Sequence, residues 1–69
     1  MNWTKTEIQG VKVDALYNQG VLAGYLVFNS GRSTWMLHRG DHQMFFQVYT
    51  RDEGMRVLEE IVRFGRWGA

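Results

Sequence analysis

The chain has 69 residues, of which 45% are hydrophobic and 14% aromatic, and its formal net charge is +1. This composition predicts one folded domain spanning residues 1–69, near the lower size limit for a core that forms without help. The absence of cysteine excludes disulfides, thiolate nucleophiles and thiolate metal sites, and the small net charge implies no particular class of partner. We expect a cytoplasmic protein without a membrane span, because no apolar run approaches about 18 residues and the first five residues lack an apolar signal region.

Three turn signals divide the first fifty residues into four strand-like pieces. They are Asn18-Gln19-Gly20, Ser30-Gly31 and Gly40-Asp41. Loops this short make neighbouring strands antiparallel. Gly40 in the first loop position favours a type II′ turn. Gly10 is interpreted as a β-bulge, because the alternation of polar and apolar residues changes phase there.

The register of the three hairpins can be tested for consistency. Two-residue loops would pair Val13 with Leu26, Leu26 with Trp35, and Trp35 with Phe46. The three hairpins then agree on one apolar face, made of Val11, Val13, Ala15, Leu22, Leu26, Phe28, Trp35, Leu37, Met44, Phe46 and Val48. The sequence therefore predicts a four-stranded antiparallel meander, whose register is specified by that face.

The segment from Arg51 to about Phe64 predicts a helix. Thr50 and Glu53 fit a capping box at its start, and Gly65 and Gly68 suit its end. Its apolar stripe consists of Val57, Leu58, Ile61, Val62 and Phe64. We expect this stripe to pack on the apolar face of the sheet, which gives an α+β fold with one C-terminal helix on one sheet face.

The run Met44-Phe45-Phe46 places large apolar side chains on both faces of one strand. One helix covers one face, so the other face must meet solvent, a second copy, a partner, or the N-terminal segment with Trp3 and Ile8. That face is predicted to carry Lys12, Asp14, Leu16, Ala23, Tyr25, Val27, Arg32, Thr34, Met36, His38, Gln43, Phe45, Gln47 and Tyr49. An apolar centre of Tyr25, Met36 and Phe45 inside a polar rim is typical of a protein interface. The predicted partner-binding residues are Tyr25, Arg32, Met36, His38, Phe45, Gln47 and Tyr49.

Catalytic and metal-binding motifs are lacking. His38 and His42 flank a hairpin turn, and in the predicted register they point to opposite faces, so they would not chelate one ion. The glycines are dispersed rather than gathered into a phosphate-binding loop. We expect no enzymatic activity, no cofactor, no metal and no small-molecule substrate.

Two segments carry a resemblance. Gly31-Arg32-Ser33-Thr34-Trp35 leads from a turn into a strand tryptophan, and Val48 to Met55 runs from a strand end into a capped helix. Together, residues 24–60 resemble the three-stranded-sheet-plus-helix DNA-binding domains of the ethylene-response-factor and integrase arm-binding types. In that family the sheet face away from the helix enters the major groove. The resemblance implies Arg32, Thr34, His38 and Gln47 as the DNA contacts here.

Two functions from different classes follow from the open sheet face. The first is a non-catalytic protein-binding module, and its short, cysteine-free format is similar to that of small phage accessory proteins that inhibit host or defence proteins. The second is nucleic-acid binding through Arg32, Thr34, His38, Arg39, Gln47 and Arg51, with Arg32, Arg39 and Arg51 on phosphates. A homodimer through the same face needs the same chemistry as a protein partner.

Overall fold

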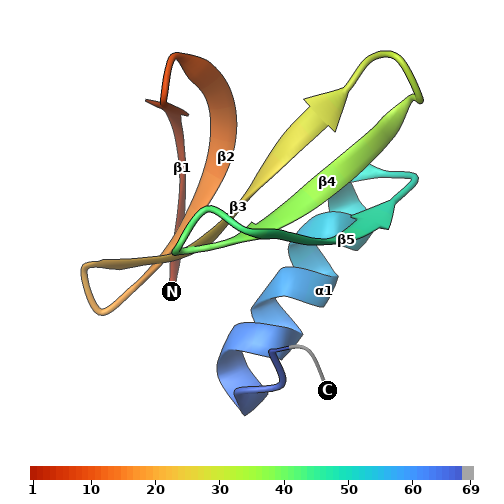
Figure 1. The fold of residues 1–69 in the computed structure, drawn as a ribbon. Coiled ribbons are helices and arrows are strands. Elements are labelled where there is room, and N and C mark those ends of the chain that lie inside the picture. Colours follow the sequence, from red (N-terminus) through yellow and green to blue (C-terminus); the bar gives the residue numbers. More distant parts are fainter. Residues whose placement is uncertain (68–69) are drawn as a thin grey trace.

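The computed structural model describes residues 1–67 and consists of five strands followed by one helix (Figure 1). The elements are β1 (Asn2–Ile8), β2 (Val11–Asn18), β3 (Val21–Asn29), β4 (Thr34–Arg39), β5 (Met44–Val48) and α1 (Arg51–Phe64). All neighbouring strands are antiparallel, and their order in the sheet is their order in the chain. The α+β class and the C-terminal helix are confirmed. Gly68, predicted to belong to the helix end, lies outside the described residues.

The prediction of four strands was wrong by one, because the N-terminal segment is itself a strand. Gln9 and Gly10 have φ angles of 54° and 79°, which are the positive values that a two-residue type I′ hairpin turn requires. Gly10 is therefore a turn residue and not a bulge. β1 pairs with β2 along its whole length, from Asn2 opposite Tyr17 to Ile8 opposite Val11, so it extends the sheet and does not cover a face.

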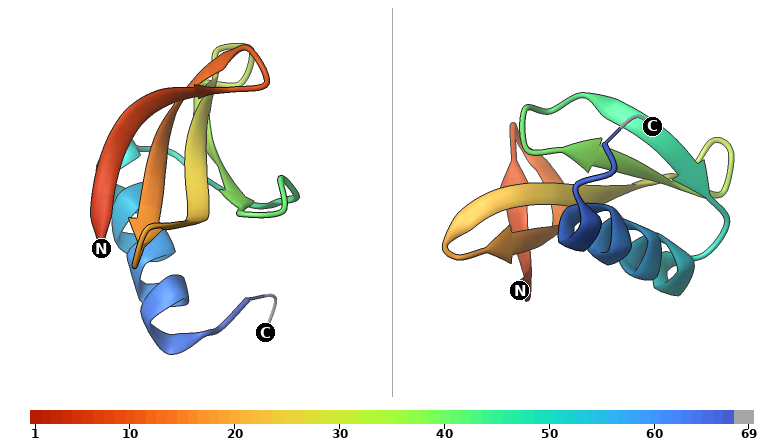
Figure 2. Two further views of the ribbon diagram at one scale, coloured as in Figure 1. Left: turned by 90° about the vertical axis from the view of Figure 1, so that its left-hand side faces the viewer. Right: turned by 90° about the horizontal axis from the view of Figure 1, so that it is seen from below.

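α1 lies along one face of the curved sheet, against β3, β4 and β5 (Figure 2). Its ends match the predicted signals. The Thr50 side chain accepts a hydrogen bond from the Glu53 backbone amide at 3.1 Å, and Gly65 ends the helix with a left-handed φ of 66°. The helix-side core consists of Leu16, Leu26, Leu37, Val48 and Leu58. Trp3 packs against this core and donates a hydrogen bond from its indole nitrogen to the Glu59 carboxylate, which ties the first strand to the helix.

The register between β2 and β3 differs from the predicted one by a single bulge. The loop at Gln19-Gly20 is as predicted, with Tyr17 opposite Leu22, but Ala23 then has no partner and Leu16 lies opposite Gly24. Because this extra residue inverts the alternation, every β2 residue before Tyr17 changes face. Val13 and Ala15 therefore lie opposite the helix, whereas Leu16 enters the helix-side core and Asp14 contacts α1.

The β3–β4 and β4–β5 hairpins, in contrast, have longer loops than predicted. Ser30 to Ser33 connect β3 to β4, which brings Leu26 opposite Leu37 instead of Trp35. In the last hairpin the loop has three residues, Gly40 to His42, and the positive φ of 73° belongs to His42 rather than to Gly40. The predicted type II′ turn was therefore wrong.

β5 contains a second bulge. His38 lies opposite Met44 and Leu37 opposite Phe46, which leaves Phe45 without a partner on β4. Strict alternation does not hold at such a residue. Phe45 consequently packs against the helix-side core, and its ring meets the Trp67 ring edge-on at a centroid distance of 5.3 Å. The prediction that Phe45 lies on the face opposite the helix was wrong for this reason.

Candidate functional site

The sheet face away from α1 carries its own apolar cluster, and we call this surface the open face. Its buried centre is Val13, Ala15 and Tyr25, with Ile8, Tyr17, Leu22 and Val27 packed around them. Met36 lies opposite Val27, His38 opposite Tyr25, and Gln47 opposite Met36, so these residues extend the same face across β4 and β5. Among residues 1–67 no helix lies over this cluster.

Tyr25 lies at the centre of the open face, between two histidines. Its ring stacks on the His38 ring at 4.7 Å and 7°, and its hydroxyl is 3.1 Å from His42 Nδ1. The prediction that His38 and His42 point to opposite faces was therefore wrong, because the three-residue loop turns His42 back over Tyr25. Burial raises the pKa of the Tyr25 hydroxyl, and the negative charge of Asp41 adds to the rise. Tyr25 thus stays neutral near physiological pH.

His38 is the other polar group set into this face. Burial lowers the pKa of His38, an effect that the nearby Met36 backbone opposes and the charge of His42 reinforces. Its Nδ1 atom is buried, and within the described chain it has no hydrogen-bond partner of good geometry. His38 is therefore a half-buried ring, stacked on Tyr25, whose neutral form is favoured.

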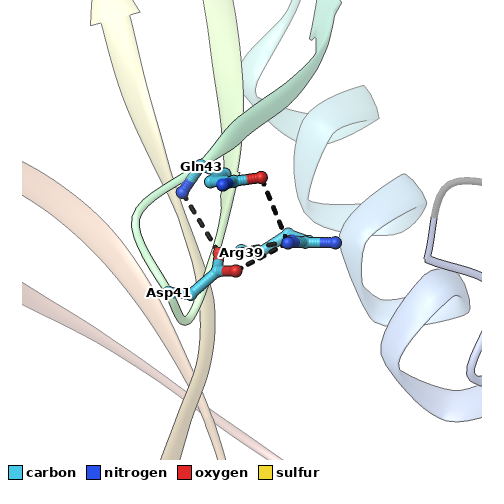
Figure 3. Close-up of polar contacts among 3 residues, drawn as sticks. All are labelled: Arg39, Asp41 and Gln43. Carbon is cyan, nitrogen blue, oxygen red and sulfur yellow. Dashed lines mark hydrogen bonds and ion pairs between the residues drawn. The ribbon is translucent and has the colours of Figure 1, made fainter.

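The loop that carries His42 is held in shape by a small polar network (Figure 3). The Arg39 guanidinium donates from Nε to Asp41 Oδ1 at 3.2 Å and from a terminal nitrogen to Asp41 Oδ2 at 2.6 Å. The same terminal nitrogen reaches Gln43 Oε1 at 3.2 Å, and the Gln43 backbone amide donates to Asp41 Oδ1 at 3.2 Å. The hydrogen bond to Arg39 lowers the pKa of Asp41, and the reciprocal contact raises the pKa of Arg39. Arg39 is therefore engaged within its own loop.

Further polar contacts order the far end of the open face. The Thr34 hydroxyl donates to Gln47 Oε1 at 3.0 Å, and Asn29 Nδ2 lies 3.8 Å from the Met36 sulfur. Both contacts link side chains on neighbouring elements. Met36 and Gln47 thus lie together with Tyr25 and His38, as predicted, although Phe45 does not.

The remaining predicted residues lie apart from this group. Arg32 is exposed in the loop between β3 and β4, and Tyr49, which is 81% exposed, lies between β5 and α1. Arg51 is on the helix side, where its guanidinium donates to both oxygens of Asp14 at 3.0 and 3.1 Å. That contact raises the pKa of Arg51. The three arginines predicted for phosphate contacts are therefore dispersed, and two of them are paired with carboxylates.

Comparison of the chain with protein-family models, with curated proteins and with solved structures finds no match. Across residues 1–67, no group of three or more histidine, cysteine, aspartate or glutamate side chains is arranged to hold a metal ion. In the same residues, α1 is neither long enough nor apolar enough to cross a membrane.

Sequence reasoning missed a hollow of about 490 Å³ on the helix side, lined in part by the Asp14 that binds Arg51. One wall is aromatic, with Phe28 and Trp35 at a centroid distance of 5.1 Å. The opposite wall comes from β1 and β2 and includes Lys5, Glu7, Lys12 and Asp14. Cross-strand pairs of opposite charge, Lys5 opposite Asp14 and Glu7 opposite Lys12, line it. The alternation of Lys5 and Glu7 in the sequence was the available signal, but it is visible only once β1 is recognised as a strand.

Proposed function

We propose that this chain is a non-catalytic protein-binding module that acts through the open face. The observation that carries the proposal is the apolar cluster on β1, β2 and β3. No further element of residues 1–67 packs over this cluster. Small domains commonly bury one sheet face against their own helix and leave a second apolar face only where something else meets it.

The layout of the open face supports this proposal. Val13 and Tyr25 are each only 5% exposed, so the centre is well packed and rigid before any partner arrives. Val27 and Met36 are half-buried and offer apolar surface next to it, while Gln47 at one end is exposed. A rigid apolar centre with polar groups around it is the usual anatomy of a binding surface. The contact residues we propose are Val27, Met36, His38 and Gln47, with Tyr25 as their support.

The partner we propose is a cytoplasmic protein that presents an apolar patch of its own. An inhibitory role toward a host or defence protein, like that of small phage accessory proteins, rests on the similarity of format alone. The dispersed arginines give less support to nucleic-acid binding, because phosphate contacts need unpaired cations on one surface.

The test is an aspartate substitution at each of two half-buried apolar side chains beside the buried centre of the open face. Met36→Asp and Val27→Asp should abolish binding to the partner, because each buries an unpaired carboxylate in the contact. Val21→Asp is the matched control: it adds the same charge at a valine that is 67% exposed at the start of β3. Partner binding is first measured by pull-down with nuclease treatment and then by calorimetry, with thermal melts to verify the fold.

The proposal fails if binding survives both changes in folded protein. It also fails if the recovered ligand is nucleic acid whose affinity falls steeply with salt, because that dependence is the signature of phosphate contacts.

A further inference from the structure

β1 is the regular edge of the sheet. Its seven residues pair with β2 without interruption, and within residues 1–67 no element pairs with its outer side. β5, at the other edge, has a bulge at Phe45, and such a distortion disfavours pairing with a further strand. Backbone pairing with another chain is therefore expected at β1 and not at β5.

The hairpin turn determines which backbone groups of β1 face outward. A β-turn with Gln9 and Gly10 at its centre makes Ile8 and Val11 a hydrogen-bonded pair. Hydrogen-bonded and non-hydrogen-bonded pairs alternate along an antiparallel ladder. The amide and carbonyl groups of Trp3, Lys5 and Glu7 therefore point away from β2, where they are free to pair.

The charges of β1 select one partner and one register. Lys5 and Glu7 are both exposed, both lie on the helix side of the sheet, and both carry outward backbone groups. When two copies of β1 run antiparallel about a twofold axis at Thr6, Lys5 of each copy lies opposite Glu7 of the other. Moving the axis to Lys5 places the two lysines opposite each other, which is unfavourable.

The Thr6 axis also satisfies the hydrogen bonding. Lys5 and Glu7 of the second copy form a hydrogen-bonded pair on each side of the axis, while Thr6 faces Thr6 in a non-hydrogen-bonded pair. Threonine opposite threonine is itself a favourable cross-strand pair. The same register therefore follows from charge and from backbone geometry.

We propose that the chain forms a twofold homodimer in which β1 pairs antiparallel with β1 of a second copy about Thr6, joining two five-stranded sheets into one of ten. Such a dimer leaves the open face of each copy accessible, so it goes beyond the proposed function and does not compete with it.

The first experiment uses disulfide formation to test the distance between two introduced cysteines. It is possible because the chain has no cysteine of its own. In the proposed dimer the two Thr6 Cα atoms are about 4.5 Å apart, within the range that a disulfide spans. Thr6→Cys should give a covalent dimer under mild oxidation. Thr4→Cys is the matched control on the same face of the same strand, since its two copies would be separated by about 14 Å along the strands.

The second experiment exchanges the charges. Lys5→Glu and Glu7→Lys should each raise the dimer dissociation constant by about tenfold or more, because each places like charges opposite each other twice. An equimolar mixture of the two single variants should form a heterodimer, which separates the contact between chains from the like charges that each change also places opposite Asp14 or Lys12 within its own chain. Arg56→Glu, on an exposed pair with Glu60 on α1, controls for the change in net charge. Sedimentation across a concentration series gives the oligomeric state, and melts verify the fold.

The inference is overturned if the chain stays monomeric throughout the series, or if Thr6→Cys and Thr4→Cys cross-link to the same extent. It is also overturned if Met36→Asp, but neither charge reversal, dissociates a dimer, because the open face would then be the contact. Loss of the β1 dimer with partner binding intact would leave the proposed function standing.

Discussion

Replacing Gly24 with alanine should destabilise the fold, because at this residue β3 lies close to the backbone of β4 and to a side chain of α1. A Cβ atom added there would lie 2.6 Å from the backbone oxygen of His38 and 3.0 Å from Leu58 Cδ1. The Leu58 side chain can rotate to relieve the second contact. The first contact involves the main chain of β4, so relieving it requires a movement of the strand that carries His38 beside Tyr25.

The magnitude follows from two opposing effects. Overpacking a close-packed core costs about 1–3 kcal/mol, and a contact with backbone belongs in the upper part of that range. Alanine regains about 0.5–1 kcal/mol relative to glycine, because it loses less backbone entropy on folding. The net loss of unfolding free energy should be about 1–2 kcal/mol. This is a large fraction of the total of about 3–10 kcal/mol expected for a chain of this size.

Urea denaturation followed by tryptophan fluorescence measures this loss. With a slope near 1 kcal/mol/M, the unfolding midpoint should fall by about 1–2 M at an unchanged slope. Gly31→Ala is the matched control, since its added Cβ would meet only the Asn29 side chain at an ordinary 3.4 Å. Its effect should stay within about 0.5 kcal/mol. An unchanged or raised midpoint for Gly24→Ala would refute the reasoning, because it would mean that β3 and β4 are not as close as described.

Three further predictions concern the helix and the open face. Thr50→Ala should lower the free energy of unfolding by about 1 kcal/mol through loss of the helix cap, as measured by urea denaturation. Trp3→Phe should cost about 1–2 kcal/mol in the same assay, because it removes the hydrogen bond to Glu59; an effect no larger than that of a surface substitution would contradict that contact. Burial lowers the pKa of His38 in the folded protein, so below the ordinary value of 6.5 the unfolded chain binds more protons. Stability should therefore fall as pH drops through 6.5 and level off below the folded pKa, and His38→Gln should flatten that profile.

The helix and the class of fold were predictable because their signals are local. Thr50, Glu53 and Gly65 act through the backbone of their own turn, and the apolar stripe around Leu58 has helical spacing. The positions of three turns were also predicted, since glycine and asparagine mark them, whereas the turn at Gln9-Gly10 was interpreted as a bulge. Agreement among three hairpins on one apolar face, however, did not guarantee the right face for each strand.

The errors arose where one residue departs from the alternation. A bulge at Ala23 exchanged the faces of Val13 and Leu16, and a bulge at Phe45 moved this one residue of the predicted interface centre to the helix side. The cause lies in contacts between elements far apart in the chain. Leu16 packs with Leu58 of α1 in the helix-side core, and Phe45 contacts Trp67 only because the helix returns the chain to β5. No local pattern contains that information.

The strand order, which repeats the chain order, has a consequence for synthesis on the ribosome. Each new strand can pair with the one made just before it, so most contacts are short in sequence and the sheet should form quickly. The core beneath it cannot close until Leu58 has emerged, and the hydrogen bond between Trp3 and Glu59 spans 56 residues. A nascent chain that ends before α1 would therefore expose the helix-side apolar face of its sheet, and chaperone binding should be strongest at that length.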